Sequence, residues 1–356
     1  MKIVYITNES YLDHSYTVAK ELGKRENLMV YILAKEGTEE IVKWCSRLNA
    51  EFVKRKRYRN PLSFFAELKF ILSVKKHKAD CVWFNTLNFY QLLLVKLFLK
   101  KFLVMVHDVE FHPELKDPFA AFSVKLSFAL LKRKLCTASE TQASIYEKRY
   151  GFKPLVFQLP IIDYFSDIAS QQLPEKRSSD ITRFFFFGSI KRYKGIETLI
   201  EAAEILESRK SKYEINIYGK FRYEAGELIS RLKKLRNVKL QNEFMRYDKI
   251  CGVYLQNDVL ILPYKHVTQC GPLLIGFNEL VPSICSDLPG FREYVEEGKS
   301  GLIFDNSAQG LADKMMLLIN NRGLIGKMKE FIKTDTFRKY SMKNLLDRYI
   351  KNLSGI

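Results

Sequence analysis

The sequence predicts an α/β protein made of two doubly wound, Rossmann-like domains, and three observations lead to this prediction. The chain has 356 residues, which exceeds one ordinary core and suits two domains of similar size. Short apolar runs rich in β-branched residues alternate with helical patterns along the chain. An apolar content of 47% is sufficient to fill two cores.

The first predicted domain covers residues 1–165. Helical patterns separate seven apolar runs that have the length of buried parallel strands. These runs lie at residues 3–6, 29–33, 51–53, 81–84, 102–106, 135–138 and 155–159. The segment 166–180, SDIASQQLPEKRSSD, is rich in Ser, Gln, Pro and charged residues without an apolar period, and we interpret it as the interdomain linker.

The second predicted domain covers residues 181–335. It begins with the strand RFFFFG at 183–188, and an amphipathic helix follows at 196–208. Further strands are expected at 215–219, 238–244, 259–262 and 283–285, with a helix at 272–280 between the last two. The apolar period near the end of the chain predicts a final helix at 337–352.

The chain is strongly basic, with 58 Lys and Arg against 40 Asp and Glu, a net charge of +18. This charge implies an anionic partner, and because no basic tail is present we expect no nucleic-acid partner. One cationic run precedes an apolar helix at 62–74, and a second apolar helix at 119–134 ends in three cations. Either helix alone reads better as core, but together they predict contact with an anionic membrane surface. The run comprises Lys54, Arg55, Lys56, Arg57 and Arg59.

The cysteines and the apolar segments indicate a cellular compartment. Six cysteines show no metal-binding spacing, which predicts a reducing cytosol. The N-terminal MKIVYITNES reads as a first strand rather than a signal peptide. Lys96, Lys100 and Lys101 interrupt the most lipid-like stretch, 89–106, so we predict no spanning helix. The expected location is cytoplasmic, peripheral on the inner face of the cell membrane.

Two strand-to-helix junctions in the second half predict a diphosphate site. Free N–H groups and the positive end of a helix converge at such a junction. The first junction supplies Thr268, Gln269, Cys270 and Gly271 ahead of Pro272. The second follows Gly188 and supplies two cations, Lys191 and Lys194, which would stabilise the charge of a leaving nucleoside diphosphate without rearranging.

These junctions resemble the nucleotide-sugar site of the retaining GT-B glycosyltransferases of family 4, in the branch with a Pro-Tyr strand end followed by Thr-Gln-Ser-Gly. Cys270 stands where that branch usually has serine. The loop after Gly188, with a basic residue three places on and then Lys-Gly, also resembles this branch. Two family glutamates are absent: Val267 and Ile275 lie close to where they would fall, and Glu279 comes one helical turn too late.

The resemblance implies a GT-B fold in which an acceptor domain and a donor domain face a central cleft, and residues 336–356 cross back to the first domain. It implies His107 as the active-site histidine, with Asp108 orienting it or contacting the acceptor, and Lys191 and Lys194 as leaving-group residues. The implied donor contacts are Gly188, Thr268, Gln269, Cys270, Gly271, Pro272, Lys220, Glu243, Phe244, Glu293 and Asn8. For the loop that contains Asn8, a plain N-capping turn is an equal alternative.

The predicted function is transfer of a hexosyl-type sugar, with retention, to a saccharide acceptor that is lipid-linked, as in bacterial surface polysaccharide synthesis. We expect a UDP-sugar rather than a GDP-sugar as substrate and no cofactor. The chain lacks the Asp-x-Asp triplet that holds a divalent ion in GT-A enzymes, so we expect no metal. Three alternatives remain: a non-catalytic sugar-nucleotide-binding partner, a GT-B sugar-nucleotide epimerase, and a nucleic-acid-binding protein.

Overall fold

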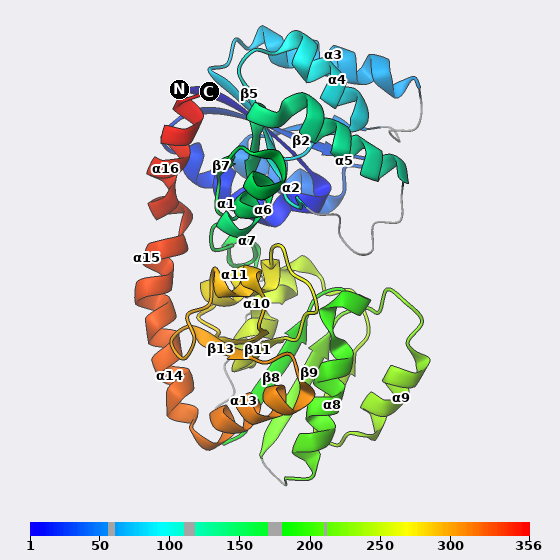
Figure 1. The fold of residues 1–356 in the computed structure, drawn as a ribbon, viewed down its shortest axis with the longest axis vertical. Coiled ribbons are helices and arrows are strands. Elements are labelled where there is room, and N and C mark those ends of the chain that lie inside the picture. Colours follow the sequence, from blue (N-terminus) through cyan, green and yellow to red (C-terminus); the bar gives the residue numbers. More distant parts are fainter. Residues whose placement is uncertain (56–60, 110–117, 170–179, 210–211) are drawn as a thin grey trace. The chain divides into compact units, whose positions relative to one another are not determined.

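The computed structural model describes residues 1–55, 61–109, 118–169, 180–209 and 212–356, and of 118–121 only the backbone. The chain divides into two compact units. The first comprises Met1–Pro160 together with Met342–Ile356, and the second comprises Ile161–Ser341. Each unit is built around its own parallel sheet (Figure 1), which confirms the predicted fold class of two Rossmann-like domains.

The first unit contains a seven-stranded sheet in the order β3-β2-β1-β4-β5-β6-β7, and every neighbouring pair is parallel. In this order the chain reverses direction across the sheet between β1 and β4, which is the doubly wound pattern. The strands are β1 (Lys2–Asn8), β2 (Asn27–Ala34), β3 (Glu51–Lys54), β4 (Cys81–Phe84), β5 (Phe102–Val106), β6 (Leu135–Thr137) and β7 (Leu155–Val156).

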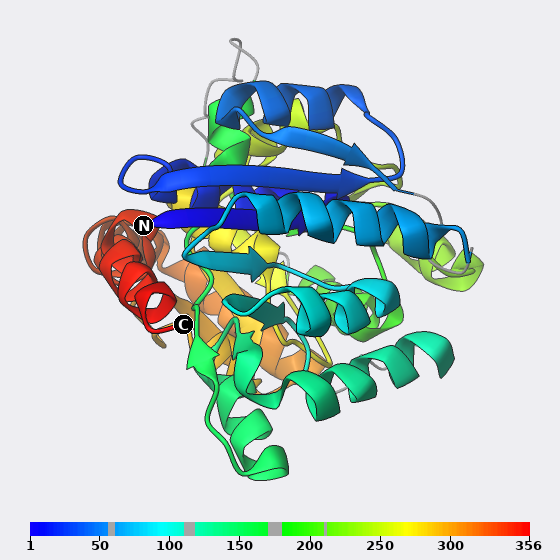
Figure 2. The same cartoon turned by 90° about the horizontal axis from the view of Figure 1, so that it is seen from above.

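Helices cover both faces of this sheet because successive strand side chains point to opposite faces. Val4 and Ile6 pack with apolar residues of α3, α4 and α5, whereas Tyr5 packs against Trp83 and so toward the face that carries Tyr349 of α16. Figure 2 shows α16 next to the N-terminus of β1. The helices are α1 (Leu12–Leu22), α2 (Glu39–Leu48), α3 (Ser63–Lys76), α4 (Phe89–Phe98), α5 (Pro118–Leu131), α6 (Glu140–Tyr150) and α16 (Met342–Ser354), with short 3₁₀ turns η1 (Glu9–Tyr11) and η2 (Lys132–Lys134).

The second unit contains a six-stranded parallel sheet in the order β10-β9-β8-β11-β12-β13. The strands are β8 (Thr182–Phe187), β9 (Tyr213–Tyr218), β10 (Val238–Gln241), β11 (Val259–Leu262), β12 (Ser283–Ser286) and β13 (Gly301–Phe304). The helices are α7 (Tyr164–Ile168), α8 (Ile196–Glu207), α9 (Gly226–Lys234), α10 (Tyr247–Gln256), α11 (Gly271–Asn278), α12 (Pro289–Arg292), α13 (Ala308–Asn320), α14 (Arg322–Phe331) and α15 (Phe337–Tyr340), with the turn η3 (Arg192–Lys194) and the π-helical turn η4 (Ile332–Thr336).

Three boundaries differ from the sequence prediction. The change of unit falls between Pro160 and Ile161, ahead of the segment 166–180, and that segment begins inside helix α7. Residues 170–179 of the predicted linker lie outside the described residues. The final helix is interrupted at Ser341, which has the extended backbone angles φ −66° and ψ 142°. The residues directly after this interruption, Met342–Ile356, belong to the first unit.

No helix within the described part of the chain is both long enough and apolar enough to cross a membrane.

Candidate functional site

In the second unit, the loop after β8 places a buried lysine against a glycine. Lys194 is only 8% exposed, and its ammonium nitrogen lies over the Gly188 backbone: a Cβ added to Gly188 would lie 3.1 Å from that nitrogen. Gly195 turns the chain into α8 with a left-handed φ of 62°, and a Cβ there would lie 1.8 Å from the Pro263 carbonyl oxygen. Only glycine therefore fits at position 195 in this loop, directly after the buried lysine.

The N-terminus of α11 lies beside the same glycine. Pro272 Cγ would lie 3.9 Å from the same Gly188 Cβ, so Gly188, Lys194 and the start of α11 converge. The Cys270 side chain makes no capping hydrogen bond, although Cys270 occupies the N-cap position. A helix N-terminus without a side-chain cap, next to a buried ammonium, attracts an anion because the helix end carries partial positive charge.

Tyr264 adds an independent sign of a ligand at this point. It is 4% exposed, and Lys194 Nζ lies 5.2 Å from the centre of its ring. Among the described residues its hydroxyl makes no close hydrogen bond, and its polar neighbour is the Cys270 thiol, a weak partner. Because a thiol is only a weak hydrogen-bond partner, an acceptor oxygen of a ligand would satisfy this buried hydroxyl better than Cys270 does.

Burial keeps the Cys270 thiol of this loop neutral. Burial raises the pKa of Cys270 to about 11, although the charge of Lys194 opposes the shift. Burial also raises the pKa of Tyr264 well above its usual value. Both groups therefore act as neutral hydrogen-bond donors at physiological pH, and the positive charge comes from Lys194 and the half-buried Lys191, whose ammonium lies 5.8 Å from the centre of the Tyr193 ring.

A second cluster borders the same loop at the ends of β9 and β10. Gly219 lies so close to Gly188 that an added Cβ would come within 2.0 Å of the Gly188 carbonyl oxygen. Beyond it, the exposed Phe244 ring has Lys220 Nζ 5.5 Å and the Arg222 guanidinium 5.2 Å from its centre. An exposed aromatic ring with two cations can stack a planar base and contact phosphate or ribose oxygens.

The other predicted donor residues have mixed placements. Thr268 and Gln269 are half-buried in the loop that leads to α11, and their role in a diphosphate cradle stays a prediction. Glu243 is exposed and accepts a hydrogen bond from Gln241, next to Phe244. Glu293 lies at the C-terminal end of the short helix α12, and its backbone oxygen accepts the Tyr340 hydroxyl at 2.5 Å.

Glu279 lies away from the loop before α11. It lies at the C-terminal end of α11, roughly 12 Å along the helix from the N-terminus that meets Lys194. There its carboxylate accepts hydrogen bonds from Ser166 at 2.6 Å, Asn278 at 2.9 Å and the Cys251 thiol at 3.2 Å. The acid therefore fixes α7 and α10 to the far end of α11.

In the first unit, a buried polar network occupies the carboxyl ends of β1 and β4. The Tyr5 hydroxyl donates to Ser15 Oγ at 3.0 Å, and Thr7 Oγ1 lies 2.8 Å from the same oxygen. The Asn85 amide nitrogen donates into this group, lying 3.0 Å from Ser15 Oγ and 3.2 Å from Thr7 Oγ1. Asn85 is 1% exposed, so its orientation is determined by these bonds.

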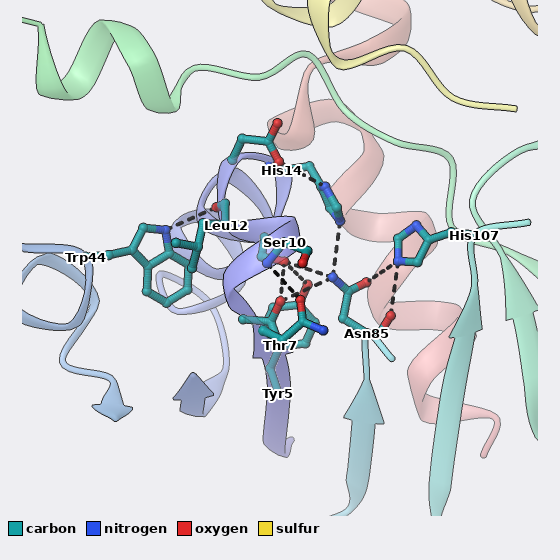
Figure 3. A network of polar contacts seen from close by, with 11 residues as sticks. Tyr5, Thr7, Ser10, Leu12, His14, Trp44, Asn85 and His107 are labelled. Atoms are coloured by element: carbon teal, nitrogen blue, oxygen red, sulfur yellow. Dashed lines mark hydrogen bonds and ion pairs between the residues drawn. The ribbon is translucent and has the colours of Figure 1, made fainter. Parts of the chain in front are cut away.

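Asn85 connects two histidines, as Figure 3 shows. Its amide nitrogen lies 3.2 Å from His14 Nε2, and His107 Nε2 lies 3.0 Å from its backbone oxygen and 3.2 Å from its side-chain oxygen. Carbonyl oxygens only accept, so His107 carries its proton on Nε2, and the neutral ring has its lone pair on Nδ1. On His14 the Asp13 carboxylate lies 3.3 Å from Nδ1, which assigns the proton to that nitrogen and leaves Nε2 to accept from Asn85.

Tyr11 completes the surroundings of His107. The two rings are stacked, with centres 4.0 Å apart and planes 9° apart. Burial raises the pKa of Tyr11 to about 12, and the charges of Asp108 and Asp13 add to the shift. Burial acts to raise the pKa of Asp13 as well, but its hydrogen bonds with His14 outweigh that effect and hold this pKa below its usual value. His107 is thus held between an aromatic ring and a fixed amide, beside the half-buried Asp108.

Asn8 and Arg55 make hydrogen bonds within the first unit. Asn8 is the N-cap of η1, where its side chain accepts from Ser10 N at 2.9 Å, which is the N-capping alternative that the sequence left open. Arg55 is half-buried and donates to the buried Glu67 at 2.9 Å, so it supports β3 and α3 rather than facing a surface. Lys54 is exposed. The remaining predicted cations lie outside the described residues: Lys56, Arg57 and Arg59.

Sequence reasoning missed Asn85, Tyr11 and Arg222. Asn85 and Tyr11 follow strands at the carboxyl edge of the sheet, and that position is the signal that could have found them. Arg222 lies two residues after Lys220 in the loop segment KFRY, and both cations lie near Phe244.

Comparison with known proteins assigns the fold. The family model described as "Glycosyl transferases group 1" matches residues 170–335. A glycosyltransferase from Rickettsia africae has a TM-score of 0.75 and 17% identity, covering 99% of this chain and 98% of its own. Anabaena HepE in complex with UDP has a TM-score of 0.75 and 15% identity over the whole of both chains.

One curated relative matches part of the sequence. It is the poly(ribitol-phosphate) alpha-N-acetylglucosaminyltransferase of Staphylococcus aureus, 23% identical over 164 residues, which is 44% of this chain and 32% of the relative. The match thus spans about a third of that protein. The solved structures share the fold at low identity, so the chain has the GT-B fold of two Rossmann-like units, and the predicted GT-B architecture is confirmed.

Proposed function

We propose that the chain is a glycosyltransferase that binds a nucleotide-sugar donor in its second unit and an acceptor in its first. The observation that carries the proposal is that three groups lie next to one another: the buried Lys194 ammonium, the Gly188 backbone and the N-terminus of α11. The match of residues 170–335 to the group 1 family supports it, because these residues contain this convergence.

In this proposal the convergence binds the donor diphosphate. Lys194 and Lys191 neutralise the charge that grows on the leaving diphosphate as the glycosidic bond breaks, and the partial positive charge at the N-terminal end of α11 contributes further. The Tyr264 hydroxyl, whose polar neighbour is the Cys270 thiol, donates to a phosphate oxygen in this proposal. Fixed cations supply the charge that a metal ion supplies in other transferases, so we propose that transfer requires no metal and no cofactor.

We propose further that the sugar is transferred with retention of configuration. The acceptor hydroxyl attacks on the face that the diphosphate leaves, and a donor phosphate oxygen takes its proton. No carboxylate pair of the glycosidase type is then required. His107, held by Asn85 and stacked on Tyr11, orients the acceptor together with Asp108.

The donor and acceptor classes follow from relatives and from the surface. HepE has been crystallised with UDP and with UDP-glucose, and the staphylococcal relative is named as an N-acetylglucosaminyltransferase, which favours a UDP-hexose type of donor. We propose a lipid-linked saccharide acceptor for surface polysaccharide synthesis at the inner face of the membrane. Exposed apolar residues of the first unit support this location: Leu62, Phe65, Leu97 and Phe122.

The test of this function is a transfer assay with UDP-hexoses and bacterial membrane lipids in the presence of EDTA. We expect label to move from the donor into a lipid-soluble product whose new bond has the anomeric configuration of the donor, read by NMR. Donor binding without any transfer to lipid or saccharide would instead identify a non-catalytic partner, and an epimerised nucleotide sugar formed without acceptor would identify an epimerase.

A further inference from the structure

A cavity of about 230 Å³ lies within the first unit beside His107. The C-terminal end of β5, the start of α4 and the middle of α5 line it, and it is partly open to solvent. Apolar side chains from all three elements line it, including the nearly fully buried Leu92, Val104, Val106 and Phe128. An apolar cavity of about 150 Å³ already holds benzene, so this one has room for a ring or a short branched chain.

The cavity is apolar on its helical walls and polar at the edge of the sheet. Asn88 Oδ1 is used to cap α4, where it accepts from Gln91 N at 2.8 Å, and Ser127 Oγ donates to the Val124 carbonyl at 2.7 Å within α5. The other polar lining groups include Asp108 and the histidine at the carboxyl end of β5, where ligands bind in this fold. A ligand that matches both parts is amphipathic.

The apolar lining continues to the outside of the unit. Phe89 lines the cavity, and its ring centre lies 6.4 Å from that of Phe122, which is 53% exposed. An apolar chain longer than the cavity therefore has an aromatic surface to follow as it leaves. This surface stabilises a bound ligand through burial of apolar area, so a saccharide without an apolar chain would gain no binding free energy from it.

We infer that this cavity binds the apolar chain of an amphipathic acceptor, with the sugar that carries the accepting hydroxyl at His107 and Asp108. Because the cavity adjoins His107 directly, the apolar chain begins within one sugar residue of that hydroxyl. The inference rests on the proposed function for the identity of the ligand as an acceptor, and it narrows the acceptor to a glycolipid whose saccharide is short.

The experiment uses n-octyl glucoside below its micelle concentration and methyl glucoside as the polar control, with methyl-labelled full-length protein observed by NMR. We expect octyl glucoside to shift the methyl signals of Val104, Met105 and Val106, and methyl glucoside to leave them in place. Val124→Phe places a larger side chain in the cavity and is expected to weaken octyl glucoside binding at least tenfold. Ala129→Phe, on an exposed position of the same helix, is expected to change it less than twofold.

Circular dichroism checks that each variant is folded, and Ser127→Met is a second, milder way to fill the cavity. Equal binding of the two glucosides, or unchanged binding by both cavity variants, would overturn the inference. UDP-sugar binding, measured on the same samples, separates this result from the proposed function. If octyl glucoside fills the cavity but no UDP-sugar binds, the proposed function fails and the cavity remains a lipid site.

Discussion

The substitution Asn85→Leu tests whether the amide between the two histidines holds the first unit together. Leucine has a similar volume but no polar atoms, so it removes the amide donor shared by His14 Nε2, Ser15 Oγ and Thr7 Oγ1, and the side-chain acceptor for His107. His107 retains the backbone oxygen of residue 85 at 3.0 Å, whereas His14 is 6% exposed and is left with a buried nitrogen that no longer receives this hydrogen bond. One such buried group costs about 1–3 kcal/mol.

Tryptophan fluorescence isolates the unit that this change affects. Trp44 and Trp83 are the two tryptophans of the chain, and both lie in the first unit. Their signal therefore follows unfolding of that unit even when the two units unfold separately. We expect the free energy of unfolding in urea to fall by about 1–3 kcal/mol and the melting temperature to fall by about 2–4 °C for each kcal/mol. Asn27→Leu, at an exposed position in the same unit, is the matched control.

A double-mutant cycle makes the reasoning refutable. Once His14→Leu has removed the nitrogen that needs a partner, Asn85→Leu should cost less than it does alone, with a coupling of about 0.5–3 kcal/mol. Additive losses, or an Asn85→Leu variant as stable as the Asn27→Leu control, would contradict the hydrogen-bond chain described for this unit.

Two further predictions concern the second unit. Gly219→Ala should destabilise that unit by about 1–3 kcal/mol in calorimetric melts, because its φ of 153° is nearly restricted to glycine and its Cβ would meet the Gly188 oxygen at 2.0 Å; Gly226→Ala, with open space around its Cβ, should not. In the native protein at pH 8, iodoacetamide should alkylate the half-buried Cys45 first and leave Cys270 as a thiol, since burial raises the pKa of Cys270 to about 11. Raising the pH toward that value should speed the reaction of Cys270, and equal rates at pH 8, read by mass spectrometry of the peptides, would show this account of the loop to be wrong.

The parts of the site that lie close in sequence could be predicted from the sequence. Gly188, Lys194 and Gly195 fall within one loop between a strand and a helix, so their proximity follows from the sequence order. The structure brings this loop to the start of α11, near Cys270, as expected for neighbouring strands β8 and β11 of one parallel sheet. The roles of these residues in binding stay predictions.

The parts that depend on distant pairings could not be predicted. The sequence presents Arg55 as one of five surface cations. In the structure it is half-buried in an ion pair with Glu67, twelve positions later. Asn85 reads as an ordinary loop residue, because its partners come from β1, α1 and the end of β5. The position of Asn85 after a strand marks it as a residue at the carboxyl edge of the sheet, but a single sequence does not identify its partners, since these contacts arise only when the sheet brings the strand ends together.

The measurement that tests the central claim most directly is calorimetric binding of UDP-, GDP- and ADP-sugars, without metal, to the wild-type protein and to two variants. Lys194→Met removes the buried ammonium and keeps an unbranched side chain, and Lys233→Met changes an exposed lysine of α9 in the same unit. We expect one nucleotide class to bind the wild type and the Lys233→Met protein equally, and Lys194→Met to lose about 1.5–3 kcal/mol, the value of a charged hydrogen bond. If no sugar nucleotide binds, or if Lys194→Met binds as tightly as Lys233→Met, the convergence at Gly188 and α11 is not a donor diphosphate site.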